Sequence, residues 1–328
     1  MLIRIYRTES NLQFIMLLIS TLLLWLPALI HPLPSPPSHS PLPYYNFILS
    51  LTGNQGILNT ILAMLLVMAE GILLTLLLSR HELFPRNNAL PALVFVLLMS
   101  WHPDLLCLHP VILHNLLMLL FLLLFLNLYE KPDPFKEVFG SSLCLSIATF
   151  LDITAFIFLL LTWAGFMIYR LFSWRIWIIN LLGFCLPYLY LFIYHFWYDN
   201  WIQTAGRFQT SFTSLEWINT DIPVITWIAL VILGFFCLAA TLSLAAMLQE
   251  RVISIRKKFL FMIWYLLLSV PVFLFSGDLR WIQGSVSMIP ATAILSYFFV
   301  RLKRLFWWEV IFSLLLCYMI WIRIFPAL

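Results

Sequence analysis

Apolar residues follow one another in long runs along most of the chain, and short polar segments separate the runs. A helix needs about 20 apolar residues to cross a bilayer, and fewer where the chain dips or tilts. The pattern predicts about eleven transmembrane helices, over 13–30, 56–79, 89–101, 110–129, 138–151, 153–172, 176–197, 223–248, 259–275, 284–300 and 305–322. The runs at 89–101 and 138–151 are too short to cross alone, so we expect half-helices shielded by their neighbours.

The composition agrees with this pattern. Of the 328 residues, 63% are hydrophobic and 10% are charged. A soluble domain has about 45–50% apolar and about 25% charged residues, so a water-soluble globule is excluded. The sequence therefore predicts an all-α integral membrane protein, with residues 1–328 as a single polytopic membrane domain and a core module over 13–300.

The positive charges predict the orientation. Lys and Arg gather on the cytoplasmic side of membrane proteins. With eleven spans and the N-terminus inside, only Arg207, Arg280 and Arg323 of the 18 basic residues fall outside. We therefore expect a bacterial inner (cytoplasmic) membrane protein with a cytoplasmic N-terminus and a periplasmic C-terminus. The net charge of +4 is a topology signal in this context and indicates no nucleic-acid partner.

Two of the predicted outer segments are long. Residues 44–52 are typical of a short amphipathic helix at the membrane interface, and the loop 198–223 has the same character. The five cysteines are scattered, without CxxC or Cys/His spacing, so neither a disulfide nor a thiolate metal site is indicated. We expect no metal and no cofactor.

Several short motifs follow one another along the chain in a recognisable order. One span is followed by an outward loop and an interfacial helix, and a later segment closes on His102-Pro103-Asp104. The other motifs lie at 79–81, 139–143, 148–151, 181–187, 280–281 and 288–291. This order resembles the shared module of GT-C type membrane glycosyltransferases, over roughly residues 13–300. The whole chain is also similar in layout to an uncharacterised bacterial family of multi-pass membrane proteins.

The GT-C resemblance implies transfer of a sugar from a polyprenyl-phosphate carrier to an acceptor at the outer leaflet. It also implies an acidic residue just after the first span and basic residues near the outer surface. This sequence departs from that pattern, because the loop 31–43 contains no acidic residue and its titratable side chains are His31 and His39. A histidine can accept a proton at neutral pH, but loss of activity is the simpler interpretation.

Four residues on the predicted outer side are candidates for chemistry. Asp104 lies between His102 and His109, so it could act as a base, ligate a metal, or belong to a solvated turn. His39 is the second candidate base. Arg207 and Arg280 would suit a carrier phosphate, because a guanidinium grips phosphate through paired donors. An ion pair between Arg280 and Asp278 is the alternative for that arginine.

Polar residues inside the predicted spans form a second group. Glu70 lies in the middle of its span, where a carboxylate costs about 2.5–3.5 kcal/mol. It is either functional or hydrogen-bonded to a neighbouring helix, for instance to His114 or Asn115. We expect His114 and Asn115 to join helices, and Asp152 either to cap the helix that begins at Ile153 or to line an outward cavity.

Three functions stay open at this point. The first is a GT-C-like inner-membrane protein that handles a polyprenyl-phosphate-linked sugar in cell-envelope glycan assembly, active or catalytically degenerate. The second is a non-enzymatic membrane subunit that binds a lipid or a membrane protein partner. The third is a transporter, which Glu70 and the two short segments allow but which no inverted repeat supports.

Overall fold

The structure is a computed structural model that describes residues 12–32, 55–85, 88–129, 131–213, 224–247, 252–274 and 280–301. Every element in these residues is helical. The longer helices are α2 (Leu12–Ile30), α4 (Gly56–Arg80), α5 (Leu90–Met99), α6 (Pro110–Leu126), α7 (Phe135–Leu151), α8 (Phe158–Tyr169), α9 (Trp174–Trp197), α10 (Trp201–Thr213), α11 (Val224–Met247), α12 (Ile253–Leu274) and α14 (Met288–Arg301). Short turns of helix form η1 (Pro103–Leu105), η2 (Ile153–Ile157), α13 (Arg280–Gly284) and η5 (Ser285–Ser287).

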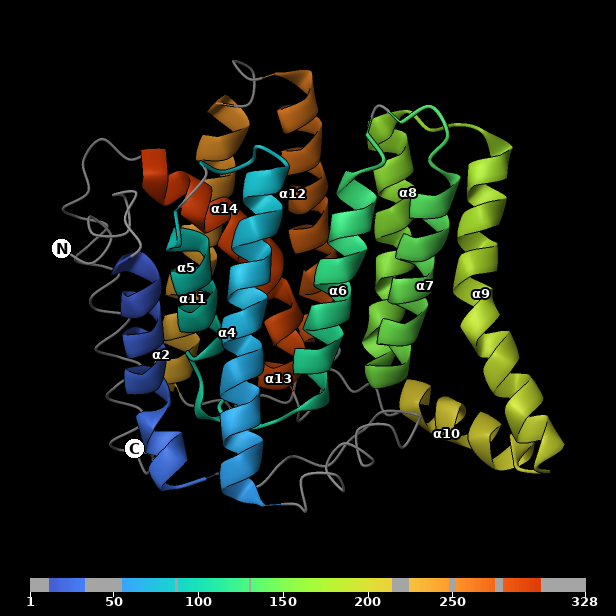
Figure 1. The fold of residues 1–328 in the computed structure, drawn as a ribbon, viewed down its shortest axis with the longest axis horizontal. Helices are drawn as coiled ribbons and strands as arrows, with labels where there is room; N and C mark the ends of the chain where they lie inside the picture. Colours follow the sequence, from blue (N-terminus) through green and yellow to red (C-terminus); the bar gives the residue numbers. More distant parts are fainter. Residues whose placement is uncertain are drawn as a thin grey trace.

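Most of the helices stand side by side, and successive ones alternate in direction (Figure 1). Within the described residues, four stretches are long and apolar enough to cross a membrane by length and composition: Gln13–Ile30, Gly56–Arg80, Trp174–Trp197 and Ile282–Val300. The chain is therefore a helical protein with membrane-spanning character, as predicted. The count of eleven spans stays a prediction, and the last of them, 305–322, lies outside the described residues.

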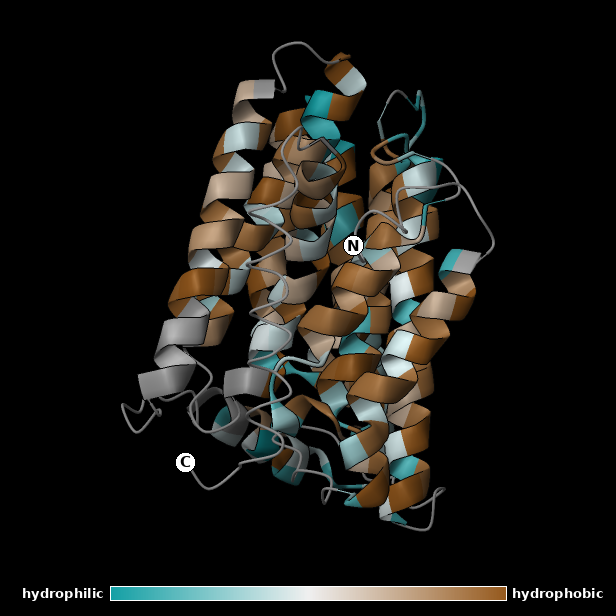
Figure 2. Ribbon diagram, turned by 90° about the vertical axis from the view of Figure 1, so that its left-hand side faces the viewer, coloured by the Kyte–Doolittle hydropathy of each residue, from teal (hydrophilic) through white to brown (hydrophobic). Residues whose placement is uncertain are grey.

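The apolar character of the helix surfaces supports this conclusion. Hydrophobic residues prevail along most of the length of the helices, and hydrophilic ones are more frequent toward the two ends (Figure 2). On α2 and α9, large apolar side chains are open to the surroundings, for example Leu23 and Trp197 at 67% and 82% exposure. Such an apolar face would be unfavourable in water and is favourable in a bilayer.

The short helix α5 is shielded as the sequence predicts. All ten of its residues are buried, because α4, α14 and α2 pack around it. Gly71 allows α4 and α5 to pack closely, since a Cβ at this position would lie 3.2 Å from the carbonyl O of Ala92. On the other side, Trp25 of α2 donates a hydrogen bond from Nε1 to Ser100 Oγ at 3.1 Å. Small residues and a buried hydrogen bond therefore fix α5 in the bundle.

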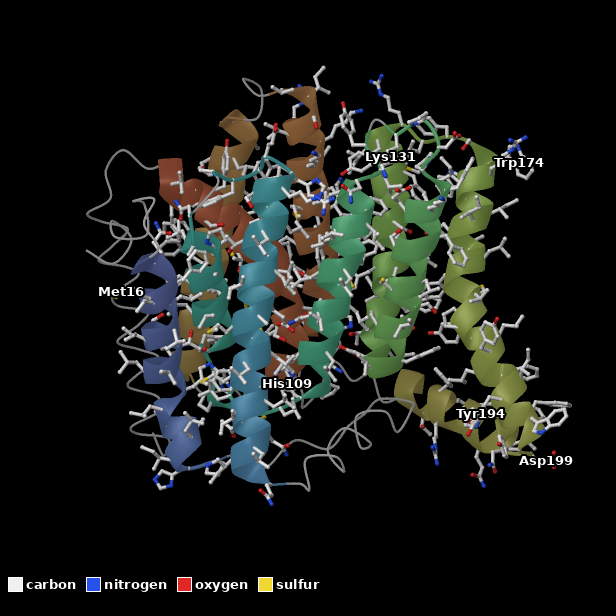
Figure 3. All side chains as sticks on the ribbon, in the orientation of Figure 1. Met16, His109, Lys131, Trp174, Tyr194 and Asp199 are labelled. Carbon is white, nitrogen blue, oxygen red and sulfur yellow. The ribbon has the colours of Figure 1, made fainter. Side chains whose placement is uncertain are left out.

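The basic residues separate between the two ends of the bundle. Figure 3 places Lys131 and Trp174 at one end and Asp199 at the other. Most described Lys and Arg residues lie at the Lys131 end, whereas α10 with Arg207 and α13 with Arg280 lie at the Asp199 end (Figure 1). We call these the basic end and the outer end, the second name following the predicted orientation, which stays a prediction. The described residues thus keep the charge partition that the sequence predicts.

The outer end also holds α10, which runs across the end of the bundle and not along it (Figure 1). The sequence predicts an interfacial helix within 198–223, and α10 is a helix with that placement. The other predicted interfacial helix, 44–52, lies outside the described residues.

Candidate functional site

The turn between α5 and α6 positions Asp104 at the outer end. Pro103 begins η1, where its missing N–H costs no hydrogen bond. The backbone N–H of Asp104 donates to Nδ1 of His102 at 3.3 Å, and the Asp104 Oδ2 lies 3.4 Å from the same nitrogen. The Asp104 side chain is 55% exposed, whereas that of His102 is 15% exposed. The turn therefore presents a carboxylate beside an imidazole.

The state of this imidazole follows from its surroundings. Burial lowers the pKa of His102, and the Asp104 carboxylate partly opposes this effect. Because Nδ1 accepts the backbone hydrogen bond, a neutral ring carries its proton on Nε2. Asp104 is then the group that faces outward and can accept a proton, with His102 as the support of the turn.

His109 has a different environment from this pair. It is the residue before α6, is fully buried, and neither ring nitrogen has a hydrogen-bond partner among the described residues (Figure 3). Burial lowers its pKa to about 3. Within the described part of the chain, no three His, Cys, Asp or Glu side chains converge as metal ligands would. The structure therefore joins Asp104 to His102 and leaves His109 in the core.

Arg280 begins α13, and α13 packs against η1. The turn with Asp104 and the helix that begins with Arg280 are thus neighbours at the outer end, although the Arg280 side chain lies outside the description. Arg207 has another position. It lies on α10, which packs on α9 through Phe208 and Tyr188, with ring centroids 6.0 Å apart. Figure 1 shows α10, the helix that carries Arg207, to the side of α13, which begins with Arg280.

A cavity of about 490 Å³ lies between α11, α12, α13 and α14. Its walls are almost wholly apolar, and include Cys237, Leu238, Leu267, Phe273 and Met288. Trp101 also lines this cavity. Its ring centroid is 5.6 Å from that of His102, so the cavity adjoins the turn that carries Asp104.

Glycines keep this cavity open. A Cβ on Gly234 would meet nothing within 4 Å, and Gly284 allows Phe273 to approach its backbone. This cavity is not predicted from the sequence, because its walls come from four separate segments without any common motif. The two glycines in otherwise bulky helices were the available signal.

The polar residues inside the bundle differ in part from expectation. Glu70 is fully buried, and neither carboxyl oxygen has a partner among the described residues. The hydrogen bond from Glu70 to His114 or Asn115 is therefore absent. His114 Nδ1 lies 3.4 Å from the carbonyl O of Ala148, and Asn115 Nδ2 lies 3.9 Å from Met99 Sδ. Both residues join neighbouring helices, as predicted, but not to α4.

Asp152 caps the short helix η2, as the sequence predicts. Its Oδ1 accepts the backbone N–H of Thr154 at 3.1 Å, and its side chain is buried. The remaining candidate, His39, lies outside the described residues.

Comparison with known proteins adds no relative: no family model, no curated protein and no solved structure matches the chain.

Proposed function

We propose that this protein is a GT-C-like inner-membrane protein that handles a polyprenyl-phosphate-linked sugar in cell-envelope glycan assembly. The observation that carries the proposal is the apolar cavity of about 490 Å³ whose wall residue Trp101 adjoins His102. An isoprenoid chain is apolar throughout, so it suits walls that are almost wholly apolar, and its phosphate end would lie where polar groups become frequent.

The outer end offers the groups that such a carrier needs. The Arg280 guanidinium would bind the carrier phosphate through paired donors. Asp104 would accept the proton of the acceptor hydroxyl while the oxygen of that hydroxyl forms a bond to the anomeric carbon of the sugar. The bond between the anomeric carbon and the carrier phosphate breaks in the same step, and the carrier phosphate leaves. Arg207 has no part in this scheme, because α10 lies to the side of α13. His39 stays the second candidate base.

The test is native mass spectrometry of the purified protein for a co-purified polyprenyl phosphate. Gly234→Phe places a ring in the cavity, whereas Gly206→Phe places the same ring on α10, where a Cβ also meets nothing within 4 Å. We expect the carrier on the wild type and on Gly206→Phe, and its loss from Gly234→Phe. Bulk phospholipid alone on all three proteins would overturn the proposal.

A second candidate is a non-enzymatic membrane subunit that binds a lipid or a membrane protein partner. The apolar walls of the cavity and the absence of an acidic residue in 31–43 favour it. Asp104→Asn separates the two functions, because the carrier site is unchanged and the base is removed. Altered envelope glycans with the carrier retained support the enzyme, and wild-type glycans support the binding subunit.

A further inference from the structure

The basic end of the bundle contains a set of cations from two helices. Arg80 is the last residue of α4, and Lys257 and Lys258 lie near the start of α12. Lys258 Nζ donates to the backbone carbonyl O of His81 at 3.5 Å, so the end of α4 and the start of α12 meet there. We call Arg80, His81, Lys257 and Lys258 the cation cluster.

Aromatic packing positions Lys257 of the cation cluster. Lys257 Nζ lies 4.9 Å from the centroid of the Tyr129 ring, beyond the end of α6. The Tyr129 ring in turn packs edge to face on Tyr169, at the end of α8, with centroids 5.7 Å apart. A cation over an aromatic face is held by the ring quadrupole. The lysine is therefore anchored between helices and does not extend freely from the surface.

His81 lies beside two of these cations, Lys258 and Arg80. Its side chain is buried, and its Nε2 has no hydrogen-bond partner among the described residues. Burial lowers the pKa of His81 to about 4, and the charges of Lys258 and Arg80 contribute in the same direction. The ring is thus close to two cations and offers a further polar atom beside them.

Among the described residues of the basic end, the acidic ones are Glu82, Asp133 and Glu137. Glu82 follows His81 in the chain and is exposed, and Glu137 already pairs with Lys131. Next to the cation cluster, Val252, Ile253 and Leu260 of the α12 region are exposed apolar side chains. A site with cations above an apolar helix face fits a molecule that has a phosphate and hydrocarbon chains.

We propose that the cation cluster binds the phosphate of an anionic phospholipid in the leaflet at the basic end. This site lies at the opposite end of the bundle from the proposed carrier site and does not depend on it. Inorganic phosphate has the same chemistry, so the test has to separate the two sources.

The experiment is native mass spectrometry of the whole protein in detergent with added phosphatidylglycerol or phosphatidylcholine. We expect the wild type to retain phosphatidylglycerol selectively. In the double variant Lys257→Gln/Lys258→Gln, retention should fall on the order of 30-fold, since each cation near an anionic surface contributes about fivefold. The matched control is Lys136→Gln/Arg175→Gln, which removes two exposed charges at the same end and should retain the lipid like the wild type.

Three outcomes would overturn the proposal: equal retention by the double variant and its control, retention of phosphatidylcholine as well as phosphatidylglycerol, or displacement of the lipid by millimolar inorganic phosphate. The last outcome would assign the site to a soluble anion. If the double variant does not fold, as judged by its melting temperature, Lys257→Gln alone carries the test, with Lys136→Gln as its control.

Discussion

Phe273 of α12 lies against Gly284 of α13 so closely that a Cβ on Gly284 would come 2.6 Å from Phe273 Cδ2. Both residues line the cavity between α11, α12, α13 and α14. In Gly284→Ala, the ring of Phe273 has to move, and the cavity is the open space beside it. We expect reduced retention of the co-purified lipid with a melting temperature close to that of the wild type. A large loss of stability with full lipid retention would contradict this account of the cavity.

Gly165 of α8 is the matched case in a closed core. A Cβ there would lie 2.3 Å from Phe125 Cζ and 2.8 Å from Phe261 Cε2. The rings of Phe125 and Phe261 are stacked, with centroids 4.5 Å apart, so neither can yield easily. We expect Gly165→Ala to destabilise the protein by about 1–3 kcal/mol or more through overpacking. Thermal denaturation in detergent measures this cost, and a stability equal to that of Gly284→Ala would show that the core can relax.

The fold was predictable where one physical rule dominates. Apolar run length placed most of the helices, and the burial of all ten α5 residues follows from the need to shield backbone that is too short to cross. The boundaries were less predictable. The predicted span 153–172 is in fact η2 followed by α8, because Asp152 caps a 3₁₀ turn before the α-helix begins.

The candidate site was predictable only in part. η1 and α13 are neighbours because both lie at the outer end, and the distribution of Lys and Arg along the sequence predicts that position for both. The separation of Arg207 was not predictable, because run lengths fix the end of a helix but not its lateral neighbours. The cavity was hidden for the same reason, since its walls meet only through the packing of four segments.

A substitution of Glu70 tests whether this buried residue has a structural or a functional role. Both carboxyl oxygens lack a partner among the described residues, and burying an unsatisfied polar group costs about 1–3 kcal/mol. We expect Glu70→Met to raise stability by a similar amount and to leave lipid retention unchanged. Thermal denaturation and native mass spectrometry check the two parts. Destabilisation of the variant would show that Glu70 makes a stabilising interaction in the folded protein. A stable variant that has lost its activity would favour the transporter.

His81 gives the stability of the protein a defined pH dependence. Its pKa is lowered from 6.5 to about 4 in the folded state, so the unfolded chain binds a proton that the folded protein does not between these values. Stability should therefore fall as the pH drops from 6.5 towards about 4. His81→Asn should flatten this decline, whereas the exposed His31→Asn should keep it. Melting temperatures across this range provide the measurement, and identical slopes for both variants would exclude the effect.

Asp104 and His102 provide a prediction at the outer end. The Asp104 N–H donates to His102 Nδ1 at 3.3 Å, so His102 supports the turn, and Asp104 is the proposed base. His102→Asn can keep an acceptor for this hydrogen bond, and we expect sugar transfer to fall much less than in Asp104→Asn. Radiolabelled sugar transfer in membranes measures both variants. A larger loss in His102→Asn would assign the proton transfer to the imidazole.

Photo-crosslinking with an isoprenoid phosphate that carries a benzophenone at the chain end tests the central claim most directly. We predict crosslinked peptides from 233–241 and 284–291, which face the cavity, and their loss in Gly234→Phe but not in Gly206→Phe. Crosslinks confined to the exposed faces of α2 and α9, unchanged by Gly234→Phe, would contradict the account.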